Sequence, residues 1–263
     1  MGGVNAPRHE AVVQALDAAC GPHAGVWAAR LGLPLRTASA PVGDEVVLEV
    51  GPEGLALRLG AGPRVAVAPR AATHRQAGRR RDLLLRAVGR VEDDDLVVDA
   101  TAGLGADAFH LAAHGVRVHM FERHPLVAAL LEDALERAAA GRSGEDVRLA
   151  AERLSLTGGD ARDRLAALDP APAVVLLDPM YPVAGKRALP TKGMALFRTL
   201  VGGDDDAAEL LLVALRAARR RVAVKRPVRA PPLGAASDAP APSGSVVGTT
   251  TRYDLYAPRE AAT

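Results

Sequence analysis

Four acidic residues stand at or just after the ends of successive apolar runs in this sequence: Asp99, Glu122, Asp160 and Asp178. Short apolar runs of this kind predict buried strands, and an open parallel sheet binds its ligands beyond the carboxyl ends of the strands. An acid repeated at four strand ends therefore predicts a ligand site along one edge of a sheet. A single acid in such a place would indicate only a helix cap.

The apolar run that ends at Asp99 leads into a turn with Gly103 and Gly105, and a helical run follows from Asp107. Glycine lets the backbone turn sharply and approach a ligand because it has no Cβ atom. The spacing also fits a dinucleotide fingerprint, and a tight turn without any ligand is the simpler alternative. Residues 96–110 contain no lysine or arginine, so a diphosphate would face only carboxylates. Charge therefore favours a cationic cofactor, S-adenosyl-L-methionine, over NAD.

Glu122 ends the second predicted strand of this alternating part of the chain. A carboxylate at that place accepts hydrogen bonds from the ribose hydroxyls of a bound nucleoside. Its neighbour Arg123 could support the adenine side of the cofactor or form a surface ion pair with an acid. We therefore assign Glu122 to cofactor binding and leave both roles open for Arg123.

The stretch Asp178-Pro179-Met180-Tyr181-Pro182 follows another apolar run directly. Its prolines stiffen the loop and have no N–H to donate, so the loop presents acceptors and an aromatic ring. These groups suit an exocyclic amino group held by Asp178 and the Pro179 carbonyl while the base stacks on Tyr181. Acceptors aimed at the N–H bonds favour the attacking geometry of the amine, and no covalent catalysis is required. The alternative is a rigid turn in which Tyr181 only packs.

Basic residues gather in three stretches of the sequence. Residues 70–90 hold seven arginines against one acid, residues 216–229 hold no acid, and further basic residues follow the Asp178 loop. Such clusters contact nucleic-acid phosphates, and solvated helix faces are the alternative. The residues assigned to phosphate contacts are Arg75, Arg79, Arg80, Lys186, Lys192, Lys225 and Arg226.

The predicted strands and helices alternate regularly after Asp99, which indicates an α/β fold with a doubly wound, Rossmann-like parallel sheet. We assign residues 73–263 to this ligand-binding domain. Residues 1–72 predict a small N-terminal α+β cap, with helices at Ala11–Ala19 and Gly25–Leu31 and strands at Val46–Val50 and Leu55–Leu59.

Composition limits the remaining possibilities. The chain has 263 residues, of which 49% are hydrophobic, enough to bury a core. The single cysteine, Cys20, excludes an internal disulfide and a cysteine-cluster metal site. His110 and His114 have no third ligand pattern near them, so no metal is expected. The sequence shows no membrane-length apolar run and no secretory leader, so we expect a cytoplasmic protein without a membrane partner. The oligomeric state stays open between a monomer and a weak dimer.

Several stretches form a recognisable set: residues 99–105, 107–109, 122–123, 178–182, 224–227, 230–233 and 252–256. Together they resemble the bacterial small-subunit ribosomal RNA guanine-N2 methyltransferases of class J, and the likeness covers nearly the whole chain. The resemblance implies S-adenosylmethionine as cofactor, a methyltransferase domain over residues 73–263, and a guanine of ribosomal RNA or the 30S particle as substrate. It also implies cofactor contacts at Ala106, Asp107, Glu122, Arg123, Asp160, Ala161 and Asp178.

The sequence departs from that family at a few positions. Residues 76–81 replace a glycine-rich stretch, Ala106 replaces a usual arginine, and Tyr181 replaces a usual phenylalanine. Two other functions stay open: methylation of another nucleic-acid or protein amino group, and a non-catalytic RNA-binding assembly factor on the same fold. A nicotinamide oxidoreductase is disfavoured by the Asp178 loop and by the acids around the glycine turn.

Overall fold

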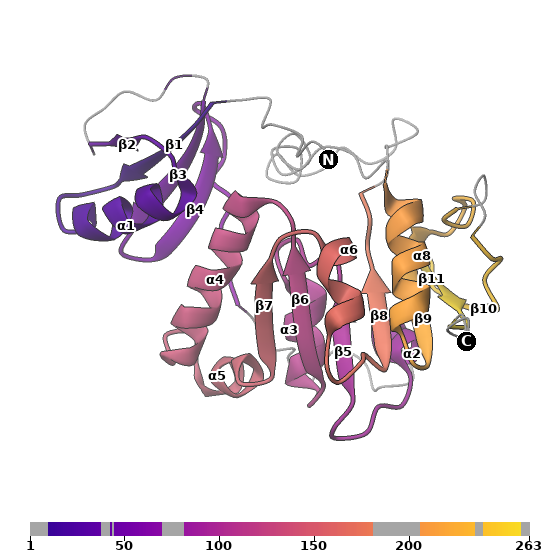
Figure 1. Ribbon diagram of the computed structural model, residues 1–263. Helices are drawn as coiled ribbons and strands as arrows, with labels where there is room; N and C mark the ends of the chain where they lie inside the picture. Colours follow the sequence, from indigo (N-terminus) through magenta and orange to yellow (C-terminus); the bar gives the residue numbers. More distant parts are fainter. Residues whose placement is uncertain are drawn as a thin grey trace. The chain divides into compact units, whose positions relative to one another are not determined.

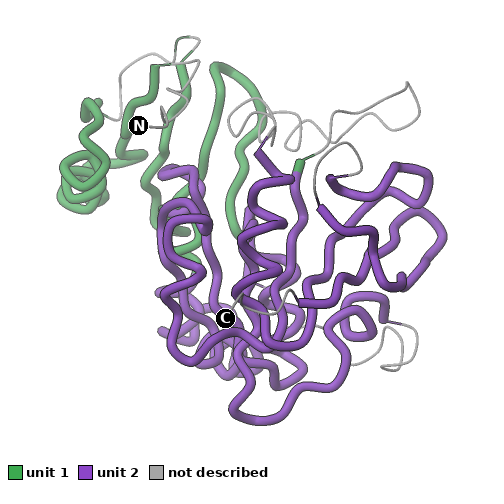
Figure 2. The backbone as a smooth tube through the Cα atoms, turned by 45° about the vertical axis from the view of Figure 1, so that its right-hand side comes forward, with its two compact units in different colours: residues 1–68, 129–134, 180–203 green, residues 69–128, 135–179, 204–263 purple. Residues whose placement is uncertain are grey.

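The computed structural model describes residues 10–37, 43, 45–69, 82–180, 206–234 and 239–258. The chain divides into two compact units (Figure 2): unit 1 contains residues 1–68, 129–134 and 180–203, and unit 2 contains residues 69–128, 135–179 and 204–263. The domain boundary expected after residue 72 stays a prediction, because residues 70–81 lie outside the described part. None of the described helices has the length and apolar character needed to cross a bilayer.

Unit 1 contains a four-stranded sheet with the order β2-β1-β3-β4. Its elements are β1 (Ala11–Ala15), α1 (Gly21–Leu31), β2 (Leu35–Arg36), β3 (Val46–Gly51) and β4 (Gly54–Leu59). The two predicted strands are confirmed as the antiparallel hairpin of β3 and β4. The predicted helix at Ala11–Ala19 is wrong, because this stretch forms β1. All five residues of β1 are buried, and β1 pairs in parallel with β2 on one side and with β3 on the other.

Unit 2 is built around a seven-stranded sheet with the order β10-β11-β9-β8-β5-β6-β7 (Figure 1). The strands are β5 (Leu96–Asp99), β6 (Arg117–Glu122), β7 (Leu154–Gly158), β8 (Val174–Leu177), β9 (Arg221–Pro227), β10 (Gly244–Val247) and β11 (Thr251–Tyr256). The five strands from β7 to β9 are parallel, whereas β11 runs antiparallel to both of its neighbours.

Helices cover both faces of this sheet. They are α2 (Leu83–Val88), α3 (Ala106–Ala113), α4 (Pro125–Ala139), α5 (Glu145–Ala151), α6 (Ala161–Arg164), the 3-10 turn η1 (Leu165–Ala167) and α8 (Ala207–Ala217). Figure 1 shows α6 and α8 in front of the sheet and α3 behind it. The predicted doubly wound α/β fold is therefore confirmed.

The strand order reverses in the middle of the sheet, which fixes the place of a ligand site. From β5 the chain builds β6 and β7 on one side and then returns to build β8 and β9 on the other. The valines of β5 and β8 are fully buried, as expected for parallel strands covered on both faces. In such sheets the crevice for a ligand opens at the carboxyl ends of the strands where the order reverses. Asp99 ends β5 and Asp178 directly follows β8 at that place.

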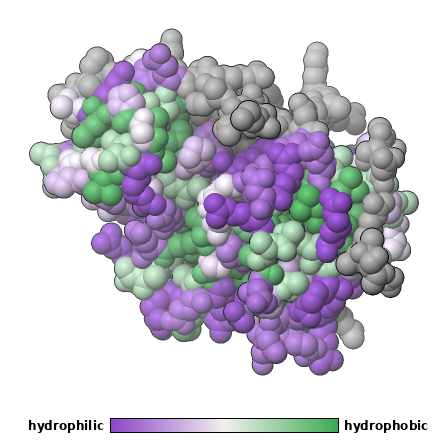
Figure 3. Space-filling view, viewed as in Figure 1, coloured by the Kyte–Doolittle hydropathy of each residue, from purple (hydrophilic) through white to green (hydrophobic). Residues whose placement is uncertain are grey.

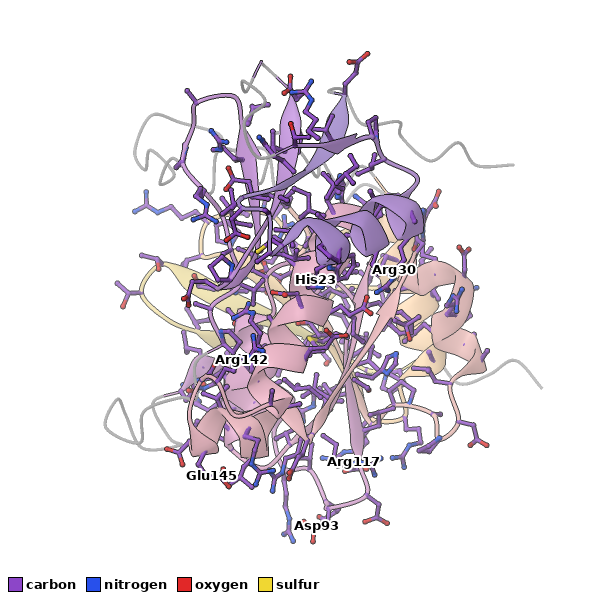
Figure 4. The ribbon with its side chains drawn as sticks, turned by 90° about the vertical axis from the view of Figure 1, so that its left-hand side faces the viewer. His23, Arg30, Asp93, Arg117, Arg142 and Glu145 are labelled. Carbon is purple, nitrogen blue, oxygen red and sulfur yellow. The ribbon has the colours of Figure 1, made fainter. Side chains whose placement is uncertain are left out.

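Part of the basic stretch at the end of α8 forms ion pairs at the amino-terminal ends of the parallel strands. Arg219 and Arg220 pair with the two carboxylate oxygens of Asp95 at 2.8 and 2.7 Å, just before β5 begins. Asp93 and Arg117, labelled in Figure 4, lie at the same amino-terminal edge. Arg219 and Arg220 therefore stabilise the amino-terminal ends of the strands, away from the expected site.

Gly89 gives the fold a testable constraint. It ends α2 with φ 77 and ψ −157, and a Cβ atom there would lie 3.3 Å from the guanidinium of Arg221. Residues other than glycine adopt such a conformation only with strain, so Gly89→Ala should lower the free energy of unfolding by about 2–3 kcal/mol. Gly141 has a φ of 74 but open space around a Cβ, so Gly141→Ala should cost only about 1 kcal/mol. Urea denaturation of both variants measures the difference, and equal losses would contradict this account.

Candidate active site

The turn between β5 and α3 begins with a buried carboxylate. Asp99 is 5% exposed, and the backbone N–H of Thr101 donates to its Oδ1 at 3.2 Å. Gly103 and Gly105 follow with φ values of 55 and 75, where glycine has no steric penalty. Gly105 is the N-cap of α3, whose first turn carries Asp107. The backbone therefore makes the sharp turn that the glycine spacing predicts.

Glu122 joins this turn to the end of β6. Its buried carboxylate accepts from the backbone N–H of Gly103 at 2.9 Å and from that of His124 at 2.8 Å, each through a different oxygen. A carboxylate can accept about four hydrogen bonds, so these contacts are compatible with ribose binding. Glu122 therefore shapes the glycine turn, a role that sequence reasoning missed.

A lysine from β9 lies between two of the acids. The Nζ atom of Lys225 is 2.9 Å from Oδ2 of Asp107 and 3.0 Å from Oδ2 of Asp178. The backbone N–H of Asp178 donates to Oγ1 of Thr101 at 2.6 Å. One charged cluster thus includes residues from the ends of β5 and β8, from β9 and from the start of α3, and we define it as Asp99, Asp107, Asp178 and Lys225.

Charges within this cluster shift its protonation equilibria. Burial raises the pKa of Asp99 to about 7, the charges of Asp107 and Asp178 add to the rise, and the Thr101 N–H and Lys225 oppose it. Burial lowers the pKa of Lys225, but Asp178 and Asp107 outweigh it, so this pKa lies above its usual range. The carboxylates of Asp107 and Asp178 outnumber the one ammonium group, and the ionised fraction of Asp99 adds to them, so the cluster has a net negative charge, which attracts a cationic ligand.

A second charged group lies where β7 leads into α6. Asp160 accepts from the backbone N–H of Arg162 at 2.9 Å and pairs with its guanidinium at 2.7 Å. Arg162 also pairs with Asp206 at 2.8 Å and Glu209 at 2.7 Å, and Arg123 pairs with Asp206 at 2.9 Å. Burial would raise the pKa of Asp160, but the bonds from Arg162 outweigh it and hold the pKa below its usual range. Figure 3 shows hydrophilic residues gathered over α6 and the start of α8.

The structure brings the described candidates for cofactor binding to the same edge of the sheet. Ala106 begins α3 and Ala161 begins α6, each beside an acid of the site. For Arg123 the structure shows the ion pair that the sequence left open. Pro179 directly follows Asp178, whereas other predicted residues lie outside the described part of the chain, namely Tyr181, Arg75, Arg79, Arg80, Lys186 and Lys192.

Two predicted phosphate contacts have surroundings that do not suit that role. Lys225 has two carboxylates as partners, and Arg226 is 5% exposed and donates to the carbonyl of Pro231. A phosphate contact needs an accessible cation, so these surroundings do not favour that role, and the assignment of both residues to RNA contacts stays a prediction. The basic run gave no information about side-chain direction. A better signal is that Lys225 ends the apolar run 222–224, because a charge on a buried strand requires a partner.

Comparison with known proteins decides the class of this chain. A protein-family model described as "Putative SAM-dependent methyltransferase" matches residues 35–258. The chain belongs to this family. It is 47% identical over 253 residues to Ribosomal RNA small subunit methyltransferase J of Pseudomonas aeruginosa strain LESB58, with 93% of each chain covered. It is 48% identical over 240 residues to the protein of the same name from Thioalkalivibrio sulfidiphilus, with 87% of this chain and 90% of the relative covered.

A solved structure supports the same assignment for the fold. The crystal structure of a SAM-dependent methyltransferase from Neisseria gonorrhoeae matches with a TM-score of 0.71 and 33% identity, covering 96% of this chain and 97% of that one. The resemblance drawn from the sequence motifs is therefore confirmed. The chain is an S-adenosylmethionine-dependent methyltransferase, and the cofactor predicted from charge is confirmed for its family.

The residues present fit this cofactor. The charged cluster has a net negative charge, which suits the cationic sulfonium and ammonium groups. Gly103 and Gly105 have positive φ values and no Cβ atoms, so the turn beside that cluster allows a ligand to approach the backbone closely. Buried Glu122 ends β6, where a ribose is held in folds of this type.

Replacing Glu122 should weaken cofactor binding. Glutamine is neutral and its amide nitrogen cannot accept, so Glu122→Gln removes a charged acceptor for the ribose hydroxyls and leaves the N–H of Gly103 or His124 without its acceptor. Such a loss costs roughly 1.5–3 kcal/mol, which is about one to two decades in affinity for S-adenosylmethionine. Isothermal calorimetry on the folded variant measures it, with the exposed Glu136→Gln as matched control. Unchanged affinity would remove Glu122 from the site.

Cofactor affinity should also depend on pH through Asp99. With its pKa raised to about 7, Asp99 is mostly protonated at pH 6 and mostly ionised at pH 8. The ionised form attracts the cationic cofactor, so affinity should rise with pH across this range, by up to about tenfold. Asp99→Asn should flatten this rise in a calorimetric titration series. The same pH dependence in wild type and variant would show that another group titrates.

Proposed function

We propose that this chain transfers a methyl group from S-adenosylmethionine to the exocyclic N2 of a guanine in small-subunit ribosomal RNA. Relatives that are 47% identical over 93% of the chain carry the name Ribosomal RNA small subunit methyltransferase J. The observation that carries the proposal is the position of Asp178. It follows β8 directly and its backbone N–H donates to Thr101 of the β5 turn, which supports an acceptor role for its carboxylate toward an amino group.

The residues of the chain act by positioning and electrostatics. When bound, S-adenosylmethionine supplies an electrophilic methyl group on a positively charged sulfur. The carboxylates of Asp99 and Asp107 favour that positive charge, and Glu122 orients the ribose. Asp178 and the Pro179 carbonyl accept hydrogen bonds from the guanine amino group and direct its lone pair. The carboxylate of Asp178 is also the group that can take the proton the amine loses.

Substrate binding requires groups beyond this cluster. We assign base stacking to Tyr181 and phosphate contacts to Arg75, Arg79, Arg80, Lys186 and Lys192, which the sequence places around the acceptor loop and before α2. The aromatic ring suits stacking, and dense positive charge suits an RNA backbone. We place the reaction in the cytoplasm, on ribosomal RNA or the 30S particle, with the enzyme acting as a monomer or weak dimer.

Replacing Asp178 tests the acceptor role. Asp178→Ala should lower the single-turnover rate of methyl transfer by at least about a hundredfold at saturating cofactor and RNA, because it removes an oriented acceptor. Its affinity for RNA should change little, since phosphate contacts dominate RNA affinity. Asp163→Asn, an exposed acid on α6, is the matched control. Affinity for S-adenosylmethionine is measured in parallel, and a near-normal rate for Asp178→Ala would refute the acceptor role.

The identity of the product tests the proposal as a whole. Small-subunit RNA from cells lacking the activity is incubated with the protein and cofactor, and its nucleosides are analysed by mass spectrometry. N2-methylguanosine is the expected product. A different methylated nucleoside or a methylated protein would replace the proposed substrate. Tight RNA binding without transfer to any substrate would instead favour an assembly factor on the same fold.

A further inference from the structure

The register of the sheet places Lys225 beside Asp178. Strands β8 and β9 are parallel neighbours, and their last paired residues are Leu177 and Val224. The next position on each strand is therefore Asp178 on one and Lys225 on the other. The ammonium group lies 3.0 Å from Oδ2 of Asp178 and 2.9 Å from Oδ2 of Asp107 on α3. This arrangement joins the acceptor loop to the cofactor turn through one cation.

Asp178 is held through both its backbone and its side chain. Its backbone N–H donates to Thr101 at 2.6 Å, and its carboxylate pairs with Lys225. The side chain of Asp178 is 48% exposed and that of Lys225 is 29% exposed. An aspartate with this exposure would sample several rotamers in the absence of a partner, at an entropic cost to any reaction that needs one of them. The ion pair with Lys225 therefore favours one orientation of the carboxylate.

Lys225 also alters the charge that faces the cofactor. Asp107 and Asp178 are both its partners, and the nearby Asp99 is only 5% exposed. A site with three carboxylates would favour a sulfonium strongly over the neutral thioether that remains after transfer. One ammonium group within hydrogen-bond distance of two of these carboxylates reduces that preference.

We propose that Lys225 is a positioning residue for methyl transfer: it orients the Asp178 carboxylate toward the acceptor amine and offsets part of the negative charge around the cofactor. This inference rests on the proposed function for its first part, whereas its second part concerns the cofactor alone. In this role Lys225 contacts Asp178 and Asp107 and does not bind the RNA.

A double-mutant cycle tests the action through Asp178. Lys225→Met should lower the single-turnover rate at saturating cofactor and RNA by at least about tenfold. The same change made in an Asp178→Asn background should lower it less than about threefold, because the group that Lys225 orients has already been altered. Lys225→Arg should restore part of the rate. Equal losses in both backgrounds would overturn the positioning role.

RNA affinity separates this role from a phosphate contact. Lys225→Met should leave the affinity and its salt dependence unchanged, whereas loss of a phosphate contact would reduce the slope of log affinity against log salt by about 0.7–0.9. Arg216→Met, an exposed arginine in the last turn of α8, is the charge-matched control for loss of one positive charge. A reduced slope for Lys225→Met beyond that of the control would assign Lys225 to the RNA.

Cofactor affinities test the charge role without any RNA. Lys225→Met should raise the ratio of S-adenosylmethionine to S-adenosylhomocysteine affinity by at least about threefold, since only the former carries the sulfonium charge. Asp107→Asn should lower the same ratio, and Lys225→Arg should leave it near wild type. These two variants keep the test decisive if Lys225→Met does not fold, because an unchanged ratio in Asp107→Asn or an altered one in Lys225→Arg would overturn the charge role.

Failure of the proposed function and failure of this inference give different results. A wild-type protein that methylates no RNA would end the proposed function, while the affinity ratios would still support or overturn the charge role of Lys225. A wild-type protein that methylates RNA, with Lys225→Met equally active and equally selective for the cofactor, would overturn the inference alone.

Discussion

Several carboxylates lie close together at the carboxyl ends of the strands in the seven-stranded sheet. The other groups of the site stabilise this concentrated negative charge. Burying a carboxylate is unfavourable unless hydrogen bonds or opposite charges compensate it. Glu122 accepts hydrogen bonds from the backbone N–H groups of Gly103 and His124, and Asp99 accepts one from Thr101. Asp160 forms an ion pair with the guanidinium of Arg162. Lys225 forms ion pairs with both Asp107 and Asp178. Each acid therefore depends on a partner from another part of the chain or from the turn that follows it.

Sequence reasoning found the acids because the pattern that reveals them is local. A buried parallel strand reads as a continuous apolar run, and the residue that ends it is visible one position later. The end of β5 at Asp99 and the end of β6 at Glu122 were predictable in this way. The glycine turn was predictable as well, because few residue types tolerate its backbone. These signals together gave the fold class and the edge of the sheet that carries the site.

The partners of the acids were not predictable, because pairing depends on which strands become neighbours. Lys225 and Asp107 are far apart in sequence and meet only when β9 lies near α3. Arg219 and Arg220 belong to the basic stretch 216–229 described from the sequence, but they pair with Asp95 at the amino-terminal ends of the strands. The alanine-rich pattern of residues 11–19 predicts a helix, whereas residues 11–15 form β1. Its pairing with strands on both sides overrides that propensity.

The order of strands also determines when this site can form during synthesis. Strand β11 comes last of the seven in the chain, yet it lies between β9 and β10 in the sheet. Until residues 251–256 emerge from the ribosome, β9 has an unpaired edge, and an exposed edge strand can pair with other chains. Tyr253 then pairs with Lys225 in the register of β11 and β9. A growing chain can therefore complete the glycine turn early, but the strand that carries Lys225 gains its second neighbour only with the final strand.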